Sequence, residues 1–173
     1  MKRRAFGIIS LFFVLVFSTC TSQQGSSNQN TNESLFLVET VDDGNAIRID
    51  GYIGSNRNVQ IPPYINGLPV VEIGQSAFAQ KQLTSVTIPD GIRKINDLAF
   101  SLNNLTSIII PDSVTAINGM VFDSKVTNIT IGSDVTLAPF SFNAGGFITF
   151  YNENGRKAGN YTWSSGRWNF RER

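Results

Sequence analysis

Three short segments of the chain show the same alternation of apolar and polar residues. Leu83–Pro89 is LTSVTIP, Leu105–Pro111 is LTSIIIP and Val126–Ile131 is VTNITI. Alternation with a period of two predicts a β-strand with one buried face. The proline at the end of the first two segments predicts the end of the strand, because proline cannot donate a hydrogen bond to a sheet. We therefore expect each segment to supply one strand.

The residues that follow each strand also recur, so the segments are units of a repeat. After each strand come an aspartate, a pair of apolar residues and a phenylalanine. The aspartates are Asp90, Asp112 and Asp134, and the phenylalanines are Phe78, Phe100, Phe122 and Phe142. A longer unit precedes them, beginning at Val59, and a degenerate one begins at Phe147. A period of about 22 residues predicts a repeat solenoid, mainly β, with about four to five coils over residues 58–150.

Both ends of the repeat carry the pattern of a β-hairpin. Phe36–Val41 and Ala46–Tyr52 alternate around a polar turn, and so do Asn160–Trp163 and Arg167–Phe170. Solenoid ends would otherwise expose a core face and unpaired strand edges. We expect an N-terminal cap over residues 35–57 and a C-terminal cap over residues 151–173.

The N-terminal region has the pattern of a targeting segment. Met1–Arg4 is basic, Ala5–Phe17 is a mostly apolar stretch that is short for a membrane span, and Cys20 is the one cysteine of the chain. Polar residues then continue to Ser34, and such a segment cannot bury enough apolar surface to order itself. We expect a signal over residues 1–19 and a disordered tether over residues 20–34.

This arrangement resembles a bacterial lipoprotein signal, in which the cysteine is lipidated and becomes the first residue of the mature chain. The resemblance implies lipidation at Cys20, export across the inner membrane, and a lipid anchor in the cell envelope, with the outer membrane as the expected site. Phe17 and Thr19 depart from the usual residues of the lipidation box. Secretion with a free thiol and an uncleaved anchor therefore stay open as alternatives.

Composition restricts the possible chemistry. The chain has 173 residues and no histidine, which excludes an imidazole base, a Ser-His-Asp triad and a histidine-ligated metal. A single cysteine excludes an internal disulfide and a cysteine-rich metal site. A net charge of +1 gives no reason to expect a nucleic-acid surface. We predict no catalytic residue, metal or cofactor, and no small-molecule substrate.

Two candidate sites have ordinary structural explanations. The aspartates after each strand could form a cation site, but aspartate commonly begins a turn, and we expect side-chain capping there. Near the C-terminus, Tyr161, Trp163, Trp168 and Phe170 lie among basic residues, and residues 151–173 carry a net charge of +3. Aromatic and basic residues together can bind glycans, nucleic acids or phosphates, but we expect them to form the hydrophobic and soluble parts of the cap hairpin.

The outward positions of the strands form the candidate recognition surface. Solenoids commonly bind partners through such a face, although a merely solvated sheet face is the alternative. Two of its residues are apolar and would be the first anchors to test. The predicted binding face consists of Asn58, Gln60, Ser85, Thr87, Ser107, Ile109, Asn128, Thr130, Phe147 and Thr149.

The pattern LTSxTIPxxVxxIxxxAF in Leu83–Phe100 and Leu105–Phe122 resembles the BspA-type, or treponemal-type, leucine-rich repeat of a family of lipoproteins. The lead-in Ile65–Val70 and the tail Asn154–Trp163 also resemble family members, so the resemblance covers residues 35 to 165. Gly132 replaces the usual proline in the fourth unit, where we expect some distortion.

The resemblance implies a non-enzymatic envelope protein that mediates protein–protein contact. Its partner would be a host matrix protein or the surface protein of another bacterium, bound through the stacked strand face. A periplasm-facing structural lipoprotein without a host ligand is the alternative. An enzyme using two carboxylates is a remote third possibility, because the repeated aspartates lie in turns.

Overall fold

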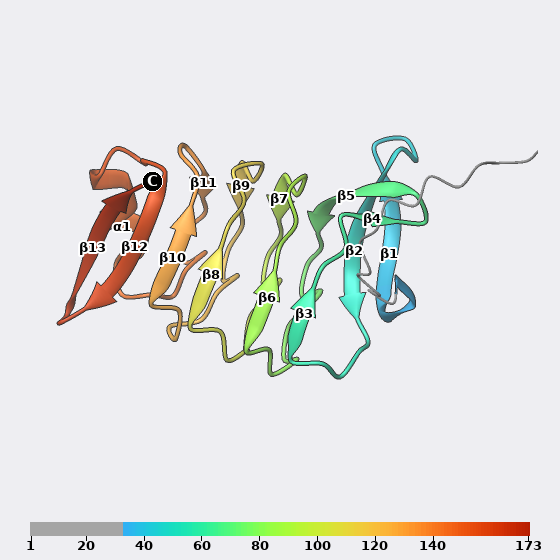
Figure 1. The fold of residues 1–173 in the computed structure, drawn as a ribbon, viewed down its shortest axis with the longest axis horizontal. Coiled ribbons are helices and arrows are strands. Elements are labelled where there is room, and N and C mark those ends of the chain that lie inside the picture. The colour runs from blue at the N-terminus through green and yellow to red at the C-terminus, as the bar shows by residue number, and fades with distance from the viewer. Residues whose placement is uncertain (1–32) are drawn as a thin grey trace, which may run out of the picture.

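The computed structural model describes residues 33–173, which form a solenoid of stacked coils with a hairpin at each end (Figure 1). The predicted signal over residues 1–19, Cys20 and residues 21–32 lie outside the described residues. The tether was expected to continue to Ser34, but Glu33–Leu35 form a short 3-10 helix, η1. Its Glu33 carboxylate accepts a hydrogen bond from the Asn66 backbone N–H at 3.0 Å, which ties this turn to the first coil.

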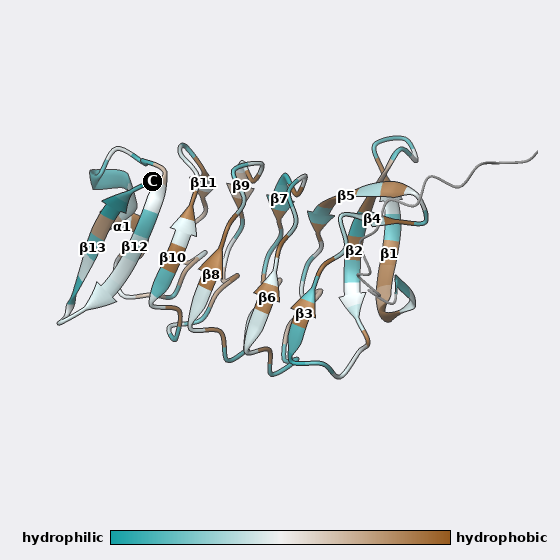
Figure 2. Cartoon of the chain, in the orientation of Figure 1, coloured by the Kyte–Doolittle hydropathy of each residue, from teal (hydrophilic) through white to brown (hydrophobic). Residues whose placement is uncertain are grey.

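Four parallel strands in the described chain form one face of the stack, which we call the strand face (Figure 1). They are the segments predicted from the sequence, and apolar residues alternate with polar ones along β3, β6 and β10, whereas β8 ends in two apolar residues (Figure 2). Strand β3 pairs with β6, and β8 pairs with β10. The four strands are β3 (Asn58–Gln60), β6 (Ser85–Thr87), β8 (Ser107–Ile109) and β10 (Asn128–Ile131).

A second parallel sheet lies on the opposite side of the coils, where the sequence analysis expected only inward-turning apolar residues. Its strands in three of the coils are two residues long, too short for a period of two to be visible in the sequence. Strand β4 (Tyr64–Ile65) pairs with β5 at the start of this sheet. The strands that follow one another are β5 (Leu68–Ile73), β7 (Lys94–Ile95), β9 (Ala116–Ile117) and β11 (Thr136–Leu137).

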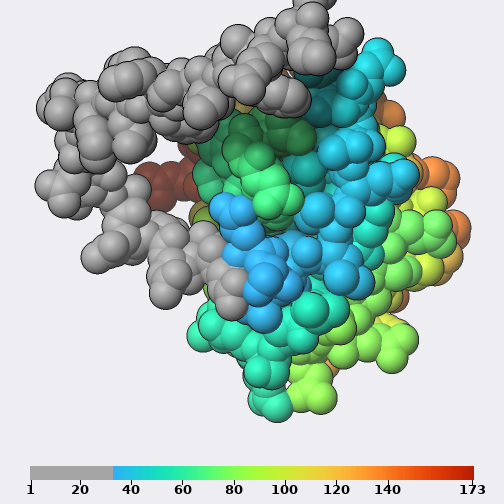
Figure 3. Space-filling view, turned by 90° about the vertical axis from the view of Figure 1, so that its right-hand side faces the viewer, coloured from blue at the N-terminus to red at the C-terminus, as the bar shows by residue number. Residues whose placement is uncertain are grey.

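The N-terminal hairpin is present as predicted. Strand β1 (Phe36–Val41) pairs antiparallel with β2 (Ala46–Tyr52), and β2 joins the second sheet by pairing with β5. The hairpin, coloured blue in Figure 3, lies over the N-terminal end of the stack. Buried Phe36 and Tyr52 continue the hydrophobic core into it.

The C-terminal end differs from the prediction at one point. Phe147–Phe150 was expected to begin a fifth strand, but Phe147–Glu153 form the helix α1. Gly146 adopts φ +79° just before it and redirects the chain, a backbone conformation that favours glycine. Within the helix Phe147 and Tyr151 lie four residues apart on one face, and both are fully buried. The predicted boundary of the repeats at residue 150 therefore falls inside this helix.

The C-terminal hairpin follows the helix and extends the strand face. Strand β12 (Gly159–Ser164) pairs antiparallel with both β10 and β13 (Arg167–Glu172), as the hairpin pattern predicted. Tyr161 and Trp168 are buried against the helix, with ring centroids 5.4 and 5.1 Å from that of Phe147. These rings close the C-terminal end of the core.

A column of phenylalanine rings runs through the centre of the coils. The ring centroids of Phe78 and Phe100 are 5.2 Å apart, those of Phe100 and Phe122 5.5 Å, and those of Phe122 and Phe142 4.7 Å, all in stacked orientation. The packing of each phenylalanine on the next, expected from the spacing, is thus confirmed. The column continues through Phe142 despite the unusual fourth unit.

A buried asparagine joins the turn before β8 to the turn before β6. Asn103 is 4% exposed, and its Oδ1 accepts hydrogen bonds from the N–H groups of Leu83 at 2.9 Å and Lys81 at 3.2 Å. Its Nδ2 donates to the carbonyl oxygens of Phe78 at 2.8 Å and Phe100 at 2.7 Å. The side chain therefore satisfies backbone groups that would otherwise be buried without partners.

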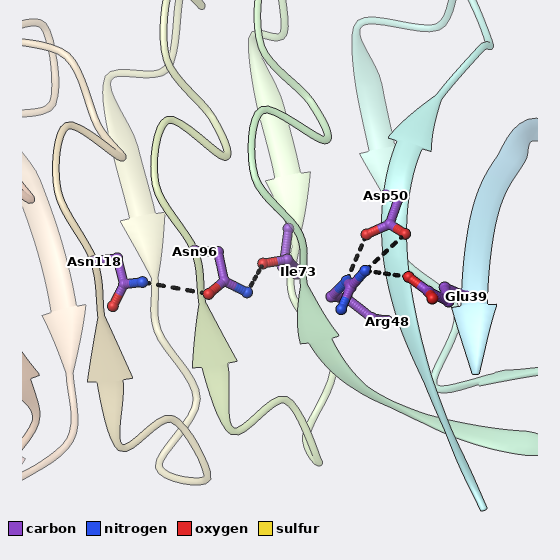
Figure 4. A network of polar contacts seen from close by, with 6 residues as sticks. All are labelled: Glu39, Arg48, Asp50, Ile73, Asn96 and Asn118. Atoms are coloured by element: carbon purple, nitrogen blue, oxygen red, sulfur yellow. Dashed lines mark hydrogen bonds and ion pairs between the residues drawn. The ribbon is translucent and has the colours of Figure 1, made fainter. Parts of the chain in front are cut away.

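A second chain of polar contacts crosses the coils on the other side (Figure 4). Asn118 donates to Asn96 Oδ1 at 3.3 Å, and Asn96 Nδ2 donates to the carbonyl of Ile73 at 3.0 Å. In the N-terminal cap, Arg48 binds Asp50 at 2.6 Å and also pairs with Glu39. The hydrogen bond to Asp50 raises the pKa of the Arg48 guanidinium. The asparagine contacts join neighbouring coils, and Arg48 ties the two strands of the cap hairpin together.

We predict that Phe100→Ala lowers the free energy of unfolding by about 3–5 kcal/mol, because it removes a fully buried ring from the middle of the column. Chemical denaturation followed by circular dichroism measures the change. Phe140→Ala is the matched control, since its ring is 71% exposed, and should change the stability by less than about 1 kcal/mol. Equal losses in both variants would contradict the role of the column.

Ser141 is a buried residue whose hydroxyl has no hydrogen-bond partner among the described residues. Alanine holds the matching position in two earlier coils, at Ala77 and Ala99. We predict that Ser141→Ala stabilises the fold by about 1 kcal/mol, because it removes an unsatisfied buried hydroxyl. A higher denaturation midpoint would confirm this, and a lower one would show that the hydroxyl has a stabilising role.

Candidate functional site

The outward side chains of the strand face form two parallel rows. In one row Asn58 lies opposite Ser85, and Ser107 opposite Asn128; in the other, Gln60 lies opposite Thr87, and Ile109 opposite Thr130. Seven of these eight side chains are exposed, and Thr130 is partly buried. The predicted strip from residue 58 to residue 130 therefore lies on one surface.

The last two members of the predicted strip lie elsewhere. Phe147 is fully buried in α1, and Thr149, although exposed, belongs to the same helix and not to a strand. The error arose because FITF has the composition of a strand, while the two preceding glycines break the repeat. Phe147 is a core residue, so it is unsuitable for testing the strand face.

The cap hairpin supplies the residues that continue the two rows. Thr162 lies opposite Asn128 and Asn160 opposite Thr130; on the next strand, Asn169 lies opposite Thr162 and Arg171 opposite Asn160. The sequence pattern predicted a cap hairpin here, and its residues were not part of the predicted binding face. The alternation of Asn160–Trp163, with polar residues at every second position, was the signal that these side chains face outward.

The strand face is polar, with few charges. Ile109, 66% exposed, is its main apolar side chain. Where the repeats meet the hairpin, a shallow hollow of about 380 Å³ is lined by side chains that include Asn128, Asn160 and Arg171. Thr130 donates to Asn160 Oδ1 at 2.6 Å across this junction. The surface can therefore offer hydroxyl and amide groups to a partner over both repeats and cap.

The aspartates after the strands do not form a site. Asp112 makes an ion pair with Arg173. The turn after Asp90 is closed by Ser113 of the next coil, whose hydroxyl accepts from the Gly91 N–H at 3.1 Å and donates to a carbonyl. Asp90 is thus not the capping residue that the sequence suggested. The described part of the chain contains no group of three possible metal ligands.

The aromatic residues of the C-terminal cap are mainly structural. Tyr161 and Trp168 are buried, Phe170 is partly buried, and Trp163 is 37% exposed. The Tyr161 hydroxyl donates to the Lys157 carbonyl at 2.8 Å, and burial raises the pKa of this tyrosine to about 12. Within residues 33–173, no helix is long and apolar enough to cross a membrane.

A second unusual surface was not foreseen from the sequence. Leu98, Met120 and Phe140 occupy equivalent positions in successive coils, and each has a positive φ, between +53° and +62°. Large apolar residues rarely adopt this left-handed conformation, which costs roughly 1–2 kcal/mol per residue. Met120 and Phe140 are also 59% and 71% exposed. Sequence patterns report hydrophobicity but not the backbone angle, so no signal for this row was available.

A family model of the BspA-type leucine-rich repeat region matches residues 56–155 in six copies. The chain belongs to this family. None of the curated proteins compared with the chain is significantly similar to it.

Two solved leucine-rich repeat proteins illustrate the structural similarity. One from Bacteroides ovatus is 24% identical, with a TM-score of 0.53, over 64% of this chain and 32% of its own. One from T. pallidum is 25% identical, with a TM-score of 0.42, over 58% of this chain and 63% of its own. The chain therefore spans less than two thirds of either protein.

Proposed function

We propose that this protein is a non-enzymatic recognition protein of the bacterial cell envelope, which binds a protein partner through the strand face. Leucine-rich repeats of this family are typically interaction modules. The single observation that supports partner binding through this face is that the surface runs without a break from the repeats onto the cap hairpin. Outward polar side chains lie in register from β8 through β10 and β12 to β13.

Binding through this surface would be non-covalent and modest in strength. The face is short and carries one strongly exposed apolar residue, Ile109, whereas tight interfaces concentrate their energy in several buried anchors. Many copies on one cell would compensate, because multivalent attachment raises the overall affinity without new contacts. Adhesion to host matrix or to other bacteria fits weak, multivalent contacts of this kind.

The strand face can be tested with Ile109→Asp on the full chain displayed on cells. We expect binding to immobilised extracellular-matrix proteins or to partner bacteria to fall at least about tenfold, because the variant places an unpaired charge at the anchor. Thr136→Asp is the matched control, an exposed strand residue on the opposite sheet, and should bind like the unmodified chain. Equal binding by all three proteins would contradict the proposal.

The same cells can decide which side of the outer membrane the protein faces. Digestion of the protein by protease added to intact cells supports an adhesin. Resistance until the outer membrane is broken would instead support the periplasmic scaffold.

Lipidation of Cys20 is proposed as the means of attachment. Each buried methylene of an acyl chain contributes about 0.8 kcal/mol, so several chains hold a protein firmly on a membrane. We predict that Cys20→Ser moves the protein from the membrane fraction to the soluble fraction and removes the acyl mass from its N-terminal peptide. Ser22→Ala is the control and should leave the protein in the membrane fraction with its acyl mass. An unmodified thiol on Cys20 in the wild-type protein would contradict the anchor.

A further inference from the structure

An apolar hollow lies on the turns where the coils carry their left-handed residues, away from the strand face. It has a volume of about 210 Å³, and we call it the turn hollow. Met120 and Phe140 flank it and are among the most exposed large apolar side chains of the described residues. Leu102, 63% exposed, lies in the preceding turn. The turn hollow is lined by Ser101, Met120, Phe122, Asp123, Phe140 and Asn143.

The fold accounts for the left-handed backbone of these turns, but it does not account for the large apolar side chains that three of them carry. The position two residues before each phenylalanine of the column is left-handed in four coils, and in the first of them it holds Ser76, with φ +57°. A serine thus satisfies the turn. Leu98, Met120 and Phe140 place large apolar groups in the same strained conformation, and the last two leave most of their surface in water. Strain combined with exposure points to a role in recognition.

The rim of the turn hollow carries negative charge. Asp123 lines it, and one of its carboxylate oxygens accepts a hydrogen bond from the Asn103 N–H at 2.9 Å. None of the described residues that line the hollow is basic. Lys125, the nearby lysine in the sequence, donates instead to Asn104 at 2.7 Å. The second Asp123 oxygen has no hydrogen-bond or ion-pair partner among the described residues, so it can pair with a cation brought by a partner.

We propose that the turn hollow binds a protein segment that presents a bulky apolar side chain next to a basic group. The apolar side chain would lie between Met120 and Phe140, and the basic group would pair with Asp123. An apolar centre with a polar rim is the usual arrangement of a protein-recognition site. The proposal rests on the proposed recognition function but places a second contact on a different surface from the strand face.

The two methionines of the chain, Met1 and Met120, give a sharp test. The full chain is labelled with ¹³C-methyl methionine and held in lipid nanodiscs, and Met120→Leu assigns the signals. Tryptamine, an aromatic ammonium, is titrated in parallel with indole-3-acetate, which carries a carboxylate on the same ring. We expect tryptamine to shift the Met120 signal at concentrations about threefold lower, as for an exposed ion pair.

Three variants complete the experiment. Asp123→Asn should make the two probes equal, because it removes the charge but keeps an oxygen for the Asn103 N–H. Phe140→Ser should abolish the shift with either probe, and Ile109→Asp on the strand face should leave it unchanged. A Met120 signal that neither probe moves, or that both move equally in the unmodified chain, overturns the proposal.

Two further outcomes concern other occupants. A Met120 signal that shifts with protein concentration before any probe is added would assign the turn hollow to a second copy. A signal that shifts with the lipid content of the nanodisc would assign it to lipid. Either result overturns the proposal for a protein segment. Because the probes report on the turn hollow alone, these outcomes are independent of whether Ile109→Asp affects partner binding.

Discussion

The stacking of aromatic rings between coils is the interaction on which the structure depends. A single unit of 22 residues buries only a handful of apolar side chains, and their transfer from water does not offset the entropy of ordering the unit. The free energy of folding becomes favourable when a neighbouring coil covers the exposed side of each ring. Ring spacings of 4.7 to 5.5 Å, between Phe78 and Phe142, are close to the spacing of hydrogen-bonded strands. One packing distance therefore serves both the core and the sheets.

The two ends terminate this stack in different ways. At the N-terminus Tyr52 stacks on Phe78 at 5.7 Å, and Phe36 meets the same ring edge-on. At the C-terminus Phe147 turns its edge to Phe142, with an angle of 65° between the ring planes. Such a T-shaped contact leaves no parallel face for another coil. The helix that carries Phe147 thus ends the column, and β12 continues only the strand face beyond it.

The sequence alone was sufficient for the parts of the fold that rest on side-chain alternation. The strands of the strand face, both hairpins and the family were all predictable, because a period of two and a period of 22 are visible in the order of residues. The short strands of the second sheet and α1 were not. Two-residue strands have no measurable period, and in FITF the effect of Gly146 outweighed the β-forming composition. The left-handed turns at Met120 and Phe140 depend on backbone angles that composition does not report.

The C-terminal hairpin has a consequence for how this architecture can vary. Strand β12 reverses the direction of β10, and β13 reverses it again, so both strands are matched to the last coil only. The N-terminal hairpin is likewise matched to the first coils. A whole coil could be gained or lost between them without altering either junction. Each added coil would lengthen the strand face by one strand, with two more outward side chains. The size of the surface can therefore change by duplication of a single repeat, while both end hairpins stay the same.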